Sequence, residues 1–290
     1  MNDMGVIFLG IPGSGKTVLL SAFALAYHKL GFIPQTALTM GFCNDAENTL
    51  AAGAWPPPTL PQGGYKDFVW EYQHRRIHVC DIAGEDWIDF AKKEQENKNS
   101  ILNSNQDSPE KEIAKRFYSA ILIFIVLDLE EELNCGKNQR QYDLVTAVRN
   151  VINNAHERYG KKLIDTRICF VVTKFNTLGI PESHVFEKIE PYYRLIYDLN
   201  FLRHTPDIIH VDAVADTVTN DVNGFSFPAK EYRSIGLEKI KSKIEELIYT
   251  PSPPFPPSLK PDNGCLVIAI IAASVAYLEL MGIIIIIISS

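Results

Sequence analysis

This sequence contains little clustered positive charge. It has 28 lysine and arginine residues against 35 aspartate and glutamate residues, which gives a formal net charge of −7 at pH 7, and it has no long basic run. Proteins that bind nucleic acid over a broad surface neutralise phosphates with clustered lysine and arginine side chains. The charge balance excludes such a surface, and we expect no nucleic-acid partner.

Paired cysteines are also absent. The chain has five cysteines, an odd number, and no C-x-x-C motif that would indicate a zinc site or a redox couple. The first residues lack the basic start of a secretory signal. We therefore expect the N-terminal part of the chain to lie in the reducing cytoplasm. The cysteines are Cys43, Cys80, Cys135, Cys169 and Cys265.

A phosphate-loop motif lies near the start of the chain. Residues 10–17 have the sequence GIPGSGKT, which matches G-x-x-x-x-G-K-[ST], between the apolar run 6–9 and a helical pattern that begins at Lys16. The glycines of such a loop let backbone N–H groups point at the α- and β-phosphates, while Lys16 adds charge at the β and γ oxygens. Thr17 offers its hydroxyl to Mg²⁺. The motif predicts a nucleoside triphosphate site.

Predicted strands and helices alternate from this loop to residue 249, and 46% apolar composition is enough for a sizeable core. Alternation of this kind predicts an α/β fold, a three-layer sandwich around a mostly parallel sheet. The short turn 73–75 predicts one antiparallel hairpin. Residues 40–64 are predicted to form a long loop and 92–111 a polar, mobile insertion. The predicted strands are 6–9, 67–72, 76–82, 119–128, 167–173 and 208–211, and the predicted helices are 16–30, 139–159, 186–199 and 235–249.

A second motif, D-x-x-G, follows the predicted strand that ends near residue 80. Asp81 comes at the carboxyl end of that strand, and Gly84 follows three residues later. If this strand neighbours the phosphate-loop strand, the Asp81 carboxylate can reach Mg²⁺, usually through water. The backbone N–H of Gly84 could then reach the γ-phosphate.

A third motif follows the strand 167–173. Residues 173–176 have the sequence TKFN, which resembles the [NT]-K-x-D motif with which GTPases bind guanine. In that motif the lysine, here Lys174, lies along the base, and the final aspartate accepts two hydrogen bonds from guanine. Asn176 replaces that aspartate here. An amide has one acceptor oxygen and an NH₂ that faces a guanine donor, so we expect weakened guanine selectivity.

Taken in order, GIPGSGKT, DIAGE and TKFN resemble the phosphate-loop GTPases of the translation-factor and Ras-like class. The sequence WPPPT at residues 55–59, together with D-x-x-G-E, is similar more narrowly to bacterial double-GTPase domains. The resemblance implies a Ras-like sheet over residues 1–250 and GTP as ligand and substrate with Mg²⁺. It implies Thr17, Asp81 and Thr59 as metal-binding residues, with Thr36 and Thr39 as alternatives to Thr59. The nucleotide-binding residues it implies are Gly10, Gly13, Ser14, Gly15, Lys16, Thr17, Lys174 and Asn176.

The resemblance also implies a catalytic group of Lys16, Gly84 and Glu85. Glu85 occupies the position at which Ras-like proteins have a glutamine that orients the attacking water. A glutamate accepts a hydrogen bond from water, but it donates none to the γ-phosphoryl oxygens, and its charge repels them. We therefore expect slow intrinsic hydrolysis, with an activating partner or a dimer supplying positive charge.

The last quarter of the chain changes character twice. Residues 251–264 are rich in proline and predict an extended linker. Residues 265–288 are almost wholly apolar; about 24 residues span roughly 36 Å as a helix, enough for a bilayer core of about 30 Å. We interpret this segment as a transmembrane helix, with a buried core helix or a β segment as alternatives. A carboxylate within it, Glu279, indicates a helix partner, a protonated site or a shift of the helix along the membrane normal.

These features together predict a single-pass membrane protein with a cytoplasmic GTPase domain. The leading hypothesis is a nucleotide switch whose loops recruit or release a protein partner at the membrane. An ATPase or another NTPase of the same class is the alternative that Asn176 leaves open. A membrane scaffold that binds nucleotide without hydrolysing it is the third hypothesis.

Overall fold

The computed structural model describes residues 3–58, 65–96, 101, 108–130, 139–159, 165–174, 181–219, 225–229 and 233–249. The chain divides after Thr250, and all of these residues belong to the first unit, Met1–Thr250. The predicted linker 251–264 and the predicted transmembrane helix 265–288 lie outside the described residues. None of the helices formed by the described residues has both the length and the apolar character needed to cross a bilayer.

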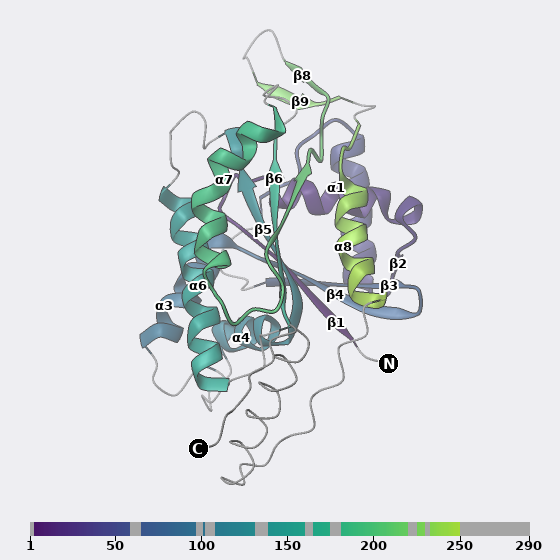
Figure 1. The fold of residues 1–290 in the computed structure, drawn as a ribbon. Helices are drawn as coiled ribbons and strands as arrows, with labels where there is room; N and C mark the ends of the chain where they lie inside the picture. The colour runs from purple at the N-terminus through teal and green to yellow at the C-terminus, as the bar shows by residue number, and fades with distance from the viewer. Residues whose placement is uncertain are drawn as a thin grey trace, which may run out of the picture. The chain divides into compact units, whose positions relative to one another are not determined.

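A seven-stranded sheet forms the centre of this unit, in the order β2-β3-β4-β1-β5-β6-β7 (Figure 1). Strand β1 pairs in parallel with β4 and β5, and β5-β6 and β6-β7 are also parallel. The inner strands are nearly continuous buried apolar runs, as expected where both faces of a parallel sheet are covered. The predicted α/β fold with a mostly parallel sheet is confirmed. The strands are β1 (Met4–Gly10), β2 (Ile33–Pro34), β3 (Tyr65–Tyr72), β4 (Arg75–Ile82), β5 (Ala120–Asp128), β6 (Arg167–Thr173) and β7 (Asp207–Val211).

The predicted hairpin is present between β3 and β4, which pair antiparallel over their whole length. Its two loop residues, Gln73 and His74, have φ angles of 49° and 61°. Two consecutive positive φ values are typical of the type I′ turn, whose twist matches that of the flanking strands. Because β2 is in turn antiparallel to β3, β3 is the one strand of the seven-stranded sheet that runs against the others.

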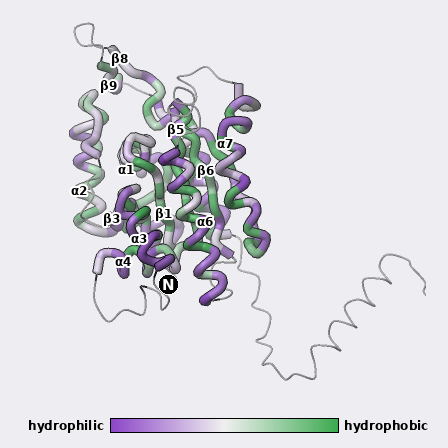
Figure 2. Tube along the Cα trace, turned by 90° about the vertical axis from the view of Figure 1, so that its left-hand side faces the viewer, coloured by the Kyte–Doolittle hydropathy of each residue, from purple (hydrophilic) through white to green (hydrophobic). Residues whose placement is uncertain are grey.

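Helices cover both faces of the sheet (Figure 1). On one face, a hydrophobic core forms between the sheet and α3 (Gly84–Glu96), α4 (Pro109–Ser119), α6 (Gln139–Tyr159) and α7 (Glu182–Tyr197). On the other, a second core forms with α1 (Lys16–Leu30), α2 (Ala37–Ala46) and α8 (Leu237–Tyr249). Figure 2 shows hydrophobic residues along the central strands, whereas hydrophilic and hydrophobic residues alternate along helices such as α6 and α7. The predicted three layers are therefore observed.

The prediction of a long loop over residues 40–64 is wrong in its first part. Residues there continue helix α2 and then a π-helical turn, η1 (Glu47–Ala51). The Thr36 side chain caps α2 by accepting a hydrogen bond from the Thr39 backbone N–H at 3.1 Å. Phe42 of α2 stacks on Phe68 of β3 with ring centroids 4.2 Å apart. Tertiary contacts with β3 thus stabilise a helix that the local sequence does not predict.

The predicted polar insertion at 92–111 is also wrong at both ends. Helix α3 continues to Glu96, and α4 begins at Pro109 after Ser108, whose side chain accepts a hydrogen bond from the Lys111 N–H. A serine cap followed by proline at the first helical position is a strong start signal for a helix. Residues 97–100 and 102–107 lie outside the described part of the chain. A further difference is a separate two-stranded hairpin of β8 (Thr217–Thr219) and β9 (Ser226–Pro228), which the sequence did not predict.

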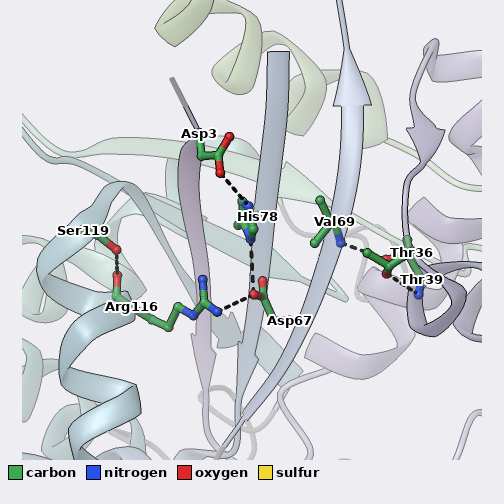
Figure 3. A network of polar contacts seen from close by, with 8 residues as sticks. All are labelled: Asp3, Thr36, Thr39, Asp67, Val69, His78, Arg116 and Ser119. Carbon is green, nitrogen blue, oxygen red and sulfur yellow. Dashed lines mark hydrogen bonds and ion pairs between the residues drawn. The ribbon is translucent and has the colours of Figure 1, made fainter. Parts of the chain in front are cut away.

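Charged side chains connect β3, β4 and α4 at the start of β1 (Figure 3). The Nδ1 atom of His78 lies 3.2 Å from the Asp67 carboxylate, and the Arg116 guanidinium lies 2.8 Å from the same group. The other ring nitrogen of His78 lies 3.4 Å from the Asp3 carboxylate. These contacts attach α4 to the strands beneath it, at the opposite end of β1 from the phosphate loop.

Candidate nucleotide-binding site

The phosphate loop connects the carboxyl end of β1 to the first turn of α1. β1 ends at Gly10 and α1 begins at Lys16, and the Ser14 N–H donates a hydrogen bond to the Ile11 carbonyl at 3.1 Å to close the turn between them. Gly13 and Gly15 have φ angles of 85° and 83°, in the left-handed region that strongly favours glycine. The backbone conformation therefore explains why glycine stands at these two positions, and the loop ends at a helix N-terminus, where N–H groups are available to anions.

Close packing surrounds this loop. A side chain at Gly84 would bring its Cβ within 2.7 Å of the Gly10 carbonyl oxygen and 3.1 Å of Ile11 Cα, so the start of α3 lies directly against the loop. Ser14 is 1% exposed, and within the described part of the chain its Oγ has no hydrogen-bond partner. A buried hydroxyl without a partner is costly, and a phosphate oxygen is a suitable acceptor for it.

The D-x-x-G motif lies beside the phosphate loop, as predicted. β4 pairs in parallel with β1 and aligns Asp81 with Phe8, two residues before Gly10. The Lys16 ammonium forms an ion pair with the Asp81 carboxylate, and the two side chains are only 6% and 3% exposed. Each of these two buried charges thus neutralises the other.

The oxygen groups here fit a magnesium ion. Mg²⁺ in nucleotide sites is bound by one or two protein oxygens, with phosphates and waters completing the shell. The Asp81 carboxylate, at the end of β4, and the Thr17 hydroxyl, in the first turn of α1, provide such oxygens on adjacent elements. Within the described ranges no group of three or more histidine, cysteine, aspartate or glutamate residues forms a metal centre of another kind.

A cavity of about 200 Å³ opens over the loop. Glu85, an exposed residue in the first turn of α3, contributes to its wall, as do Pro56 and Pro58. The sequence predicts no place for these two prolines in the site, although they belong to the WPPPT segment that contributes to the resemblance. The described residues that line the cavity are Gly10, Ile11, Pro12, Gly13, Ser14, Gly15, Lys16, Thr17, Val18, Pro56, Pro58, Ala83 and Glu85.

The third motif also reaches the phosphate loop. The hydroxyl of Thr173, the last residue of β6, donates to the Ser14 carbonyl at 2.9 Å and lies 3.1 Å from the Leu127 carbonyl. This contact holds the carboxyl end of β6 against the loop across the intervening strand β5. Sequence reasoning quoted Thr173 within the motif but did not give it this role.

Lys174 has charged partners that the sequence did not predict. Its ammonium lies 2.6 Å from Asp128 Oδ2, at the end of β5, and 3.3 Å from Glu130 Oε2. Burial lowers the pKa of Lys174, but the hydrogen bond to Asp128 and the charges of both carboxylates outweigh burial, so the pKa is raised. The Lys174 backbone has a positive φ of 62°, which is uncommon for a side chain of this type. The sequence does contain a sign of this role for Asp128. It is an aspartate at the carboxyl end of a buried apolar strand, and the phosphate loop lies at the carboxyl ends of the parallel strands.

Four of the predicted residues are not placed at the cavity by the described part of the chain. Thr59 and Asn176 lie outside the described residues. The alternative switch threonines, Thr36 and Thr39, do not line the cavity over the loop. Thr36 caps α2, and the buried Thr39 hydroxyl accepts a hydrogen bond from the Val69 N–H at 2.8 Å (Figure 3). Both hydroxyls thus support the join between α2 and β3.

No known protein family and no curated protein matches this chain. Solved structures do resemble it, among them a crystal structure of Sup35 complexed with GDP. That structure has a TM-score of 0.36 and 12% sequence identity to this chain, and the alignment covers 73% of this chain and 37% of Sup35. The chain therefore spans about 37% of the length of that protein. A similarity at this level says nothing about what the present chain binds.

Proposed function

We propose that this chain is a membrane-tethered nucleotide switch, which binds GTP with Mg²⁺ and hydrolyses it slowly. The observation that carries the proposal is the group at the carboxyl edge of β1 and β4. It combines a glycine-bent loop at a helix N-terminus, the buried Lys16 and Asp81 pair, and a buried Ser14 hydroxyl for which no described residue is a partner. Such a group suits a triphosphate and a divalent cation and few other ligands.

In this proposal a triphosphate changes the partner of Lys16. The ammonium would leave Asp81 for the β and γ oxygens, and the Asp81 carboxylate and the Thr17 hydroxyl would then be available to hold Mg²⁺. Bound Mg²⁺ would neutralise charge on the β- and γ-phosphates. The loop N–H groups hold the phosphate chain, and the Ser14 hydroxyl gains an acceptor.

Hydrolysis would follow when water attacks the γ-phosphorus and the bond to the β–γ bridging oxygen breaks, which yields a nucleoside diphosphate and inorganic phosphate. Glu85, at the wall of the cavity, can accept a hydrogen bond from that water. Lys16 is the only cation among the described residues that line the cavity. Charge developing on the γ-phosphoryl group therefore has little compensation within the described site, which supports slow turnover and an activating partner that adds positive charge.

The choice of base depends on the segment after β6. The resemblance of TKFN to the base-binding motif of GTPases supports guanine, with Lys174 beside the base. Asn176 in place of aspartate makes xanthine a useful probe, because the C2 carbonyl of XTP would accept a hydrogen bond from the amide. ATP is the alternative that this substitution leaves open.

The test is a titration of the full-length chain, purified in a mild detergent, with labelled GTP, ATP and XTP, followed by measurement of phosphate release. We expect GTP to bind in a Mg²⁺-dependent way and to be hydrolysed slowly. Lys16→Met should abolish binding, whereas Lys29→Met, which removes an exposed lysine from the same helix, should not. Binding of GTP by folded Lys16→Met would refute the proposal.

The same titration separates the other hypotheses. Preference for ATP would make the protein an ATPase of the same class. Binding without phosphate release, also after Glu85→Gln, would favour a scaffold that holds nucleotide structurally. The membrane tether is tested by deletion of residues 265–290, which should release the protein from membranes.

A further inference from the structure

The β8-β9 hairpin follows the carboxyl end of β7, at the same edge of the sheet as the phosphate loop. Figure 1 shows it at the top of the molecule, beyond the end of β6. Two contacts close its base: the Arg233 guanidinium binds both carboxylate oxygens of Asp216 at 2.9 Å, and the Ala229 N–H donates to the Asp216 carbonyl at 3.0 Å. Its two strands pair Val218 with Phe227, and both side chains are exposed.

Trp55 connects this hairpin to the segment that follows η1. Its indole Nε1–H donates a hydrogen bond to the Ser226 carbonyl at 2.7 Å, although the two residues are 171 positions apart. Trp55 is 40% exposed, whereas the other two tryptophans, Trp70 and Trp87, are buried. The contact is therefore made at the surface by a side chain that the core does not hold in place.

The residues that follow Trp55 form part of the wall of the phosphate-loop cavity. Pro56 and Pro58 line that cavity together with the loop. Each proline fixes its own φ angle and restricts the residue before it, so the segment from Trp55 to Pro58 is stiff. A displacement of the proline wall is therefore passed on to the Trp55 side chain.

The size of the cavity gives the direction of that displacement. Its volume is about 200 Å³, whereas small-molecule sites commonly measure about 300–1,000 Å³. A nucleoside triphosphate on the loop would therefore press against Pro56 and Pro58, which form part of the wall of this space. We infer that Trp55 is a tether which holds this wall against the β8-β9 hairpin, and that nucleotide binding breaks the contact with Ser226 and frees the hairpin. This inference rests on the proposed nucleotide binding.

Thermodynamic linkage makes the inference quantitative. A neutral hydrogen bond of this kind changes an equilibrium by about 2- to 10-fold. If nucleotide binding opposes the tether by such a factor, loss of the tether must favour nucleotide binding by the same factor. Trp55→Phe keeps an aromatic ring and removes the donor, so it should bind nucleotide about 2- to 10-fold more tightly than the wild type.

The experiment uses the full-length chain with Mg²⁺ and a slowly hydrolysed GTP analogue. In the wild type, the analogue should accelerate backbone hydrogen exchange in the hairpin and shift the tryptophan emission to longer wavelength as Trp55 becomes more exposed. In Trp55→Phe, hairpin exchange should already be fast and should respond little to the analogue. Tyr197→Phe is the matched control, since it removes one polar group from an exposed aromatic side chain on α7; it should behave like the wild type.

The outcomes separate this inference from the proposed function. If the wild type binds the analogue but hairpin exchange stays unchanged or slows, the tether is refuted and nucleotide binding stands. Equal affinities of wild type and Trp55→Phe would likewise refute the tether. If the wild type binds no nucleotide, the proposed function fails, and the tether fails with it.

Discussion

Removing the charge of Lys16 should destabilise the protein even when no nucleotide is present. Lys16→Met keeps the length of the side chain and leaves the Asp81 carboxylate, 3% exposed, without its cation. Breaking a buried ion pair by removing one partner costs about 3–5 kcal/mol. For a domain of this size each kcal/mol lowers Tm by about 2–4 °C, so we expect Tm to fall by about 6–20 °C.

A double-mutant cycle isolates the pair. Asp81→Asn alone leaves Lys16 uncompensated and should also lower Tm, whereas Lys16→Met combined with Asp81→Asn leaves no buried charge at either position and should recover at least half of the loss. Thermal and urea unfolding of the four proteins, at pH 7 and without nucleotide, would provide the free energies. Because exposed ion pairs are worth less than about 1 kcal/mol, a coupling free energy above about 2 kcal/mol is the expected sign of a buried pair.

Two results would contradict this reasoning. One is a Lys16→Met variant as stable as the wild type, which would mean that Asp81 is hydrated or otherwise compensated. The other is a double variant no more stable than the weaker single variant, which would mean that the two losses are independent. Either result would also remove the exchange of Lys16 between Asp81 and phosphate from the proposed mechanism.

Three further predictions concern other parts of the described structure. Gly84→Ala should weaken nucleotide binding about 5- to 150-fold because overpacking against the phosphate loop costs about 1–3 kcal/mol, whereas Gly41→Ala, with open space around its Cβ in α2, should bind normally; equal affinities in a calorimetric titration would contradict the close approach. The hydrogen bond from Lys93 lowers the pKa of Glu110 to about 2 from an ordinary 4.5. The ionised Glu110 carboxylate therefore stabilises the folded state above pH 4.5, and this contribution is lost as the pH falls toward 2. Glu110→Gln should flatten the pH dependence of Tm in that range, and an unchanged curve would refute the prediction. Burial raises the pKa of Cys43 to about 11, so this thiol should resist iodoacetamide at pH 8 until the protein is unfolded, and labelling of the native protein, measured by mass spectrometry, would show that the site is open.

Local patterns were sufficient to predict many of the secondary-structure elements. The helices α1 and α6 and the strand β6 begin and end at the predicted residues. The two helices are long helical patterns and β6 is a continuous apolar run, and residues that break such a pattern lie at the ends, such as Gly31 after α1 with a φ of 84°. The limits of these elements are set by interactions between residues that are close together in the sequence.

Other elements depend on distant contacts, and the sequence did not predict them. Helix α2 is held by the stacking of Phe42 on Phe68 and by the Thr39 hydrogen bond to β3. The β8-β9 hairpin has strands of three residues and exposed side chains, so it lacks the alternation that identifies a half-buried strand. Its contact with Trp55 joins residues too far apart for any local pattern to indicate.

The sequence by itself determined the residue types of the candidate site. Gly13 and Gly15 allow the positive φ angles of the loop, and Lys16 and Thr17 follow at the start of a helix. Both features depend only on neighbouring residues in the chain. Only the tertiary structure decided which groups meet there. The order β4-β1-β5-β6 brings Asp81 to Lys16 and Thr173 to the Ser14 carbonyl. The physical reason is that side chains at the carboxyl ends of parallel strands meet according to the order of strands in the sheet, and that order comes from packing of the whole chain.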